Sequence, residues 1–157
     1  QKHFEEKDTG PLGHKVEAVI RTIEKPVLVV SNEFKAPQTV VLAFDASKAA
    51  YKALTFIATE PAFAAVDVHI VHAGPSSDKV QSDMKHAQMH LQEHQRKSIQ
   101  QRLDGKPAEA ISAYADQHQA DLLVMGAFGH NWIHDFLMGS FTSQMLKQTN
   151  LSLLLVR

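Results

Sequence analysis

The chain has 157 residues, of which 44% are hydrophobic and 21% are charged, and this suits one globular domain of ordinary size with an appendage. A net charge of −1, and the lack of any apolar run near the ~20 residues of a transmembrane helix, exclude a basic nucleic-acid-binding surface and a membrane span. The absence of cysteine excludes disulfide bonds, a thiol nucleophile and cysteine-held zinc, and it fits a reducing cytoplasm, where we expect the protein to act.

The start of the chain resembles its own end. The segment from Gly13 to Ser31 predicts an amphipathic helix, a short turn and an apolar strand, and the segment from Gly139 onward predicts the same order. Without gaps, Val27–Val30 falls on Leu153–Val156. We interpret the match as an internal repeat.

The repeat predicts a domain organisation. Residues 1–31 would be the closing helix and strand of a preceding domain, residues 32–38 a linker, and residues 39–157 one complete domain. The chain begins with Gln1 rather than methionine, so we expect it to be a fragment of a longer protein.

From residue 39 onward, apolar runs alternate with amphipathic segments. Thr39–Asp45, for example, is a nearly continuous apolar run with β-branched residues, typical of a strand buried on both faces. The alternation predicts an α/β fold with an open, parallel, five-stranded sheet and helices on both faces. The expected strands are Thr39–Asp45, Val66–Ala73, Ser98–Leu103, Leu122–Met125 and Leu151–Val156, with helices beginning near Ser47, Asp78, Pro107 and Ser140.

A glycine-punctuated loop follows the fourth of these strands. Gly126 and Gly129 are followed, after nine residues, by Gly139 and Ser140, which gives the pattern Gly-x2-Gly-x9-Gly-Ser. Glycines allow tight turns and a close approach to a ligand, and a helix start offers free N–H groups to an anion. The pattern therefore indicates a phosphate-binding loop. The alternative is that the glycines only end a strand and that Ser140 is a plain helix cap.

Three predicted strands end in residues that could share a site. Asp45, Ala73 and Gly126 stand at carboxyl ends, where ligands bind in open α/β sheets. The Asp45 carboxylate could accept hydrogen bonds from a ribose, a base amine or the water shell of a metal, although it could also be a plain helix cap. Together with the glycine loop, this arrangement predicts a ligand site.

These motifs resemble the universal stress protein family. The resemblance rests on Val41–Ser47, Ala120–Gly126 and the glycine loop, and it covers Thr39 to Arg157. It implies a Rossmann-like fold of the adenine nucleotide alpha hydrolase type. The repeated tail is similar to that of tandem bacterial members, which carry two such domains in one chain, and members with this glycine pattern bind ATP.

The resemblance also implies a ligand and its contacts. The ligand would be ATP or a related adenine nucleotide, with Mg²⁺. In the loop, Trp132 and His134 stand where tandem relatives carry basic residues, and in the first repeat His14 replaces the serine. The implied contacts are Asp45 and Ala73 at the adenine and ribose, Gly126 and Gly129 along the ribose–phosphate path, and His130, Gly139, Ser140 and Phe141 at the phosphates.

We expect a stress-response regulatory protein that signals by binding and association. No general base is apparent beside the loop, so ATP hydrolysis should be slow or absent. The alternatives are a non-catalytic dimerisation module with a vestigial cleft, and a slow ATP hydrolase. Val27–Val30 and Leu151–Val156 are apolar strands that we expect to pair with each other or across a homodimer.

Other polar groups carry weaker signals. His86, His90 and His94 recur every four residues, so they share one helical face that could bind a metal pairwise or simply be solvated. We expect the solvated face and predict no metal site. The basic residues Lys97, Arg102 and Lys106 are expected to be ordinary surface.

Overall fold

The protein is organised around a six-stranded mixed sheet with the order β1-β6-β5-β2-β3-β4. The computed structural model describes residues 23, 25–30, 35–126 and 151–157. In that part, the strands are β1 (Val27–Val29), β2 (Thr39–Ala43), β3 (Asp67–Ala73), β4 (Ser98–Leu103), β5 (Leu122–Gly126) and β6 (Ser152–Val156). The helices are α2 (Lys48–Thr59), α3 (Asp78–Glu93) and α4 (Pro107–Gln117), with a 3-10 turn, η1 (Pro61–Phe63).

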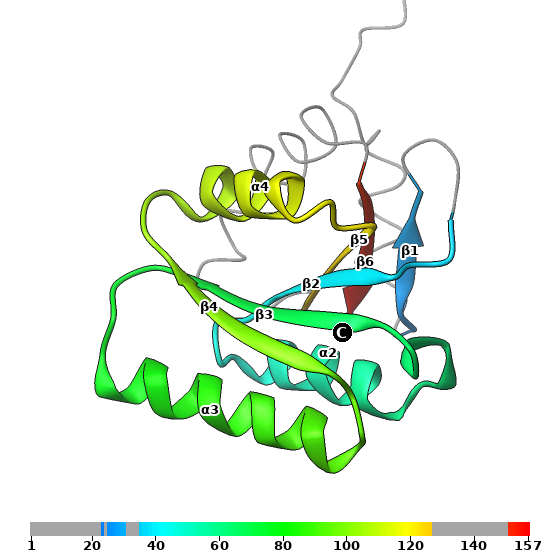
Figure 1. Ribbon diagram of the computed structural model, residues 1–157, viewed down its shortest axis with the longest axis horizontal. Helices are drawn as coiled ribbons and strands as arrows, with labels where there is room; N and C mark the ends of the chain where they lie inside the picture. Colours follow the sequence, from blue (N-terminus) through cyan, green and yellow to red (C-terminus); the bar gives the residue numbers. More distant parts are fainter. Residues whose placement is uncertain (1–22, 24, 31–34, 127–150) are drawn as a thin grey trace, which may run out of the picture.

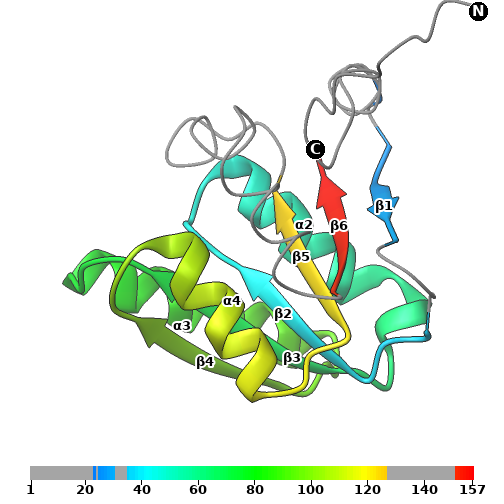
Figure 2. The same ribbon diagram turned by 90° about the horizontal axis from the view of Figure 1, so that it is seen from above.

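Five strands form the parallel sheet that the sequence predicts, and a sixth adds to it. The strands from β2 to β6 pair in parallel. β1 pairs antiparallel with β6, with Val27 opposite Leu155 and Val29 opposite Leu153. Figure 2 shows β1 beside β6 at the edge of the sheet opposite β4. The five parallel strands expected in residues 39–157 are confirmed, and so is the expected pairing of the two apolar strands within the chain, which adds the sixth strand.

Helices cover both faces of the sheet, as the alternating pattern predicts. α2 and α3 lie on one face and α4 lies on the other (Figure 1). The central strands are buried on both sides, since Val40, Val41 and Leu42 have no exposed surface. Successive residues of a strand point to opposite faces, so the apolar run of β2 supplies both cores.

The described helices begin where the sequence offers caps. The Ser47 hydroxyl accepts from the Ala50 N–H at 3.1 Å and starts α2. The Ser77 hydroxyl does the same for the Val80 N–H at the start of α3. Pro107 opens α4, where its missing N–H costs nothing.

The end of β5 lies very close to the first turn of α2. A Cβ atom placed on Gly126 would lie 2.3 Å from the carbonyl carbon of Ala49 and 2.5 Å from the Ala50 nitrogen. Both are backbone atoms, so no side-chain rotation can relieve the clash. Gly126 therefore has a packing role that is independent of any ligand.

On the face covered by α4, a histidine is held in a half-buried position. The Tyr114 hydroxyl lies 3.1 Å from Nδ1 of His69, and the rings of His69 and His118 are 5.2 Å apart. Burial lowers the pKa of His69, and the nearby His118 adds to this, while Asp67 opposes it.

Replacing Gly126 by alanine should destabilise the protein. The new methyl group must displace the backbone of α2, and overpacking of this kind costs about 1–3 kcal/mol. Chemical denaturation measures the difference. Gly105→Ala is the control, because Gly105 has a left-handed φ of +102° but open space around it. A smaller loss for Gly126→Ala than for Gly105→Ala would contradict the packing role.

The lowered pKa of His69 predicts a stability that falls in acid. The unfolded chain takes up the proton more readily, so the contribution of neutral His69 is complete above about pH 6.5 and is lost as the pH falls through the lower folded value. We expect His69→Gln to lose less stability than the wild type between about pH 7.5 and pH 5. Thermal melts at both pH values test this. His86→Gln, at an exposed position, should keep the wild-type loss, and an equal loss in His69→Gln would refute the assignment.

Candidate functional site

The strand order brings three predicted site residues together at the carboxyl ends of the strands. β2 lies between β3 and β5, so Asp45, Ala73 and Gly126 follow or end three neighbouring strands at their carboxyl ends. The sequence predicts this placement, because ligands of open α/β sheets bind at the carboxyl ends of the strands. That these residues contact a ligand stays a prediction. The other predicted site residues lie outside the described part of the chain, and they are Gly129, His130, Gly139, Ser140 and Phe141.

Among the described residues, only one of the two oxygens of the Asp45 carboxylate has a hydrogen-bond partner. Its Oδ1 accepts from the Ser47 N–H at 3.0 Å, across a turn in which Ala46 has a left-handed φ of +58°. Its Oδ2 is buried and has no hydrogen-bond partner among the described residues. A buried acceptor without a donor is costly, so this oxygen is suited to a donor that arrives with a ligand.

The Asp45 carboxylate borders a small cavity between β2, β3 and α3. The cavity has a volume of about 70 Å³. Its lining is mixed: His72 contributes from β3, while Lys79 and Asp83 form a 2.7 Å ion pair on α3. Nδ1 of His72 lies 3.0 Å from the Phe44 carbonyl oxygen. The remaining lining residues are Phe44, Ala46, Val80 and Met84.

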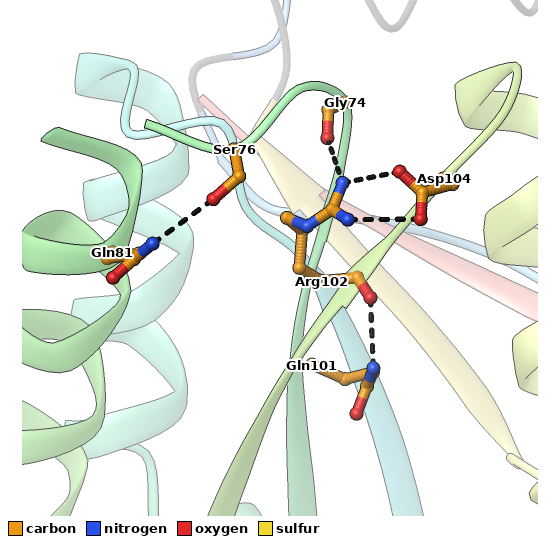
Figure 3. Close-up of polar contacts among 6 residues, drawn as sticks. All are labelled: Gly74, Ser76, Gln81, Gln101, Arg102 and Asp104. Atoms are coloured by element: carbon orange, nitrogen blue, oxygen red, sulfur yellow. Dashed lines mark hydrogen bonds and ion pairs between the residues drawn. The ribbon is translucent and has the colours of Figure 1, made fainter. Parts of the chain in front are cut away.

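Two polar residues at this end of the sheet, His72 and Arg102, were not predicted from the sequence. His72 precedes Ala73, and its hydrogen bond to the carbonyl oxygen of Phe44 joins the ends of β3 and β2. Arg102 was expected to be ordinary surface, but it binds the Gly74 carbonyl oxygen and the Asp104 carboxylate (Figure 3). Their place near the ends of predicted strands was the available signal, because that is where a ligand site is expected.

The histidine face of α3 brings two of its three members to a groove. His86 and His90 line a cavity of about 300 Å³ between α2 and α3, and the rings of His90 and His94 lie 4.6 Å apart. Across the described ranges, no group of three or more histidine or acidic side chains is arranged to hold a metal ion. Within the same ranges, none of the helices combines the length and the apolar character needed to cross a membrane.

Comparison with known proteins gives a family and a fold. The family model described as the universal stress protein family matches residues 37–157. Universal stress protein Slr1230 of Synechocystis is 35% identical over 150 residues, which are 94% of this chain and 52% of the relative. The chain thus spans about half the length of that curated relative.

Solved structures agree on the fold. A universal stress protein from Archaeoglobus fulgidus superposes with a TM-score of 0.73 at 20% identity, covering 90% of this chain and 52% of the other. A universal stress protein in complex with cAMP has a TM-score of 0.61 at 20% identity, covering 78% of this chain and 99% of the other. At this identity the likeness concerns the fold.

Replacing Asp45 by asparagine should leave the unliganded protein equally stable or more stable, by about 1 kcal/mol. The amide keeps the oxygen that accepts from Ser47, and it replaces by a neutral group a carboxylate whose second, buried oxygen has no donor among the described residues. Chemical denaturation without ligand measures the effect. Ser47→Ala is the control, since loss of a helix cap should cost about 1 kcal/mol. An equal loss in Asp45→Asn would make Asp45 a structural cap.

Proposed function

Because the chain belongs to the universal stress protein family, we propose that it binds an adenine nucleotide, with ATP as its ligand, at the carboxyl ends of β5, β2 and β3. The buried Oδ2 of Asp45, which has no partner in the part of the chain that the structure describes, carries this proposal. A base amine or a ribose hydroxyl would supply the donor that the described residues do not. That a relative of the same fold has been crystallised with cAMP supports an adenine nucleotide as the ligand class.

The described residues fit one end of such a ligand. Asp45 and Ala73 would border the adenine and ribose, and Gly126 would start the path toward the phosphates. The proposed phosphate contacts are Gly129, His130, Gly139, Ser140 and Phe141. A bound Mg²⁺ would supply positive charge at the phosphates, where this loop has Trp132 and His134 in place of basic residues.

We propose that the protein acts through binding and association, without rapid turnover. Around the described cavity, Nδ1 of His72 is engaged with the Phe44 carbonyl oxygen, and Asp83 is paired with Lys79. The remaining described acceptor is Oδ2 of Asp45, which we assign to a donor on the base or the ribose, away from the phosphates. A general base must be able to reach the proton that it removes, so this assignment favours binding over hydrolysis.

We further propose that residues 1–31 close a preceding domain, that residues 32–38 are a linker, and that residues 39–157 form one complete domain. The antiparallel pairing of β1 with β6 supports this, because two domains of one kind can join through their last strands. The alignment of 94% of this chain with 52% of a curated relative is consistent with it. Association through the apolar edge of β1, where Leu28 is 40% exposed, is the corresponding proposal for a homodimer.

ATP should quench or enhance the fluorescence of Trp132, the single tryptophan, and raise the melting temperature at millimolar nucleotide. Asp45→Asn should weaken binding by about tenfold or more, as expected for a lost hydrogen bond to a charged group. Asp116→Asn, which removes an exposed carboxylate on α4, should bind like the wild type. A flat titration together with an unchanged melting temperature would reject the proposal, and rapid phosphate release would reject the non-catalytic role.

A further inference from the structure

The segment that follows β3 is held from the side of β4. The Gly74 N–H donates to the Leu103 carbonyl oxygen at 3.1 Å, and the Gly74 carbonyl oxygen accepts from Nη1 of Arg102 at 2.9 Å. The N–H and the carbonyl oxygen of Gly74 are therefore both hydrogen-bonded to the last two residues of β4, Arg102 and Leu103. Gly74 has a φ of +152°, so the chain leaves the strand in a conformation that favours glycine.

Arg102 is itself held in a fixed orientation. Its guanidinium binds both carboxylate oxygens of Asp104, at 2.6 and 3.0 Å, while it reaches the Gly74 carbonyl (Figure 3). A bidentate pair of this kind restricts the planar guanidinium in direction as well as in distance. The hydrogen bond from Arg102 also lowers the pKa of the Asp104 carboxyl, which keeps the pair ionised.

The same loop has a second contact that does not reach the end of the strand. Nε2 of Gln81, on α3, donates to the Ser76 hydroxyl at 3.2 Å (Figure 3). This bond joins two side chains and leaves the backbone of Ala73 and Gly74 untouched. Gln81 is therefore a matched control for Arg102, because it contacts the same loop without holding the strand end.

Ala73 directly follows His72, which lines the cavity beside Asp45. Ala73 is 5% exposed and has no polar side-chain atom, so only its main chain can offer hydrogen bonds to a ligand. Main-chain recognition of a base requires that the backbone be fixed before the ligand arrives. On the outer side of β3, the only strand that can provide this is β4, which carries Arg102 at its end.

We propose that Arg102 is a positioning residue of the nucleotide cleft, which fixes the Ala73–Gly74 backbone so that it can read the base. Asp104 orients Arg102 for this task. The inference rests on the proposed function, since the base is part of the nucleotide proposed above. It adds a determinant of base specificity on β4, a strand that carries none of the contacts predicted from the sequence.

Backbone amide exchange tests the positioning without any ligand. In Arg102→Ala, the Gly74 N–H keeps its bond to the Leu103 carbonyl oxygen, but the Gly74 carbonyl oxygen is no longer held. Local opening therefore becomes easier, and the Gly74 amide should exchange faster than in the wild type, by about tenfold. Asp104→Asn should produce a smaller change in the same direction, and Gln81→Ala should leave the Gly74 amide unchanged. Equal exchange of the Gly74 amide in Arg102→Ala and the wild type would overturn the proposal.

Nucleotide affinities test the consequence for recognition. Arg102→Ala should raise the dissociation constant for ATP by about tenfold, reduce the discrimination between ATP and GTP, and leave binding of inorganic triphosphate unchanged. Gln81→Ala should keep the wild-type discrimination. An equal weakening for ATP, GTP and triphosphate would indicate general disruption and would overturn the specificity role. If the wild type binds no nucleotide, the proposed function fails, and the exchange data still decide whether Arg102 fixes Gly74.

Discussion

The close approach of β5 to α2 determines the geometry of the candidate site. Because Gly126 has no side chain, the first turn of α2 can lie directly against the end of β5, with the Ala49 backbone where a Cβ atom would otherwise be. The helix start then sits over the strand ends, and the turn that leads into it carries Asp45 into the interior. A larger residue at position 126 would have to displace the backbone at the start of α2, which directly follows Asp45 and Ser47. Packing and site geometry are thus one constraint.

Much of the fold follows from local patterns in the sequence. Ser98–Leu103 is a strand with the expected bounds. Only its ends are half-buried, because it is the outer strand beside β3. The predicted starts near Ser47, Asp78 and Pro107 agree with three helices of the structure. The antiparallel direction of β1 was not predictable from its composition, since an apolar strand can pair in either direction. The 3-10 turn at Pro61–Phe63 was also missed, because a three-residue turn has no periodicity to detect.

Site residues could be predicted where the residue type itself marks the end of a strand. They could not be predicted where a side chain binds a main-chain carbonyl oxygen. Asp45 and Gly126 could be identified because each directly follows or ends an apolar run that predicts a buried strand. His72 and Arg102 could not, because each acts on a main-chain oxygen, of Phe44 and of Gly74, whose direction leaves no trace in the sequence. Gly126 also shows that one signal can have two causes, since its packing role alone would explain the glycine.

Two carboxylates at opposite ends of the strands show why the carboxyl ends are the candidate site. At the amino ends, Oδ2 of Asp121 accepts from the Gln38 and Thr39 N–H groups, at 2.8 and 2.9 Å, and so joins the start of β2 to the segment before β5. At the carboxyl ends, Asp45 has one buried oxygen that receives no donor from the described ranges, next to Ala46 with its left-handed φ. Unfavourable features of this kind persist where the surrounding structure holds them and where function uses them. An aspartate therefore stabilises the sheet at the amino ends of the strands. At the carboxyl ends, an aspartate has an oxygen that can still accept a hydrogen bond from a ligand.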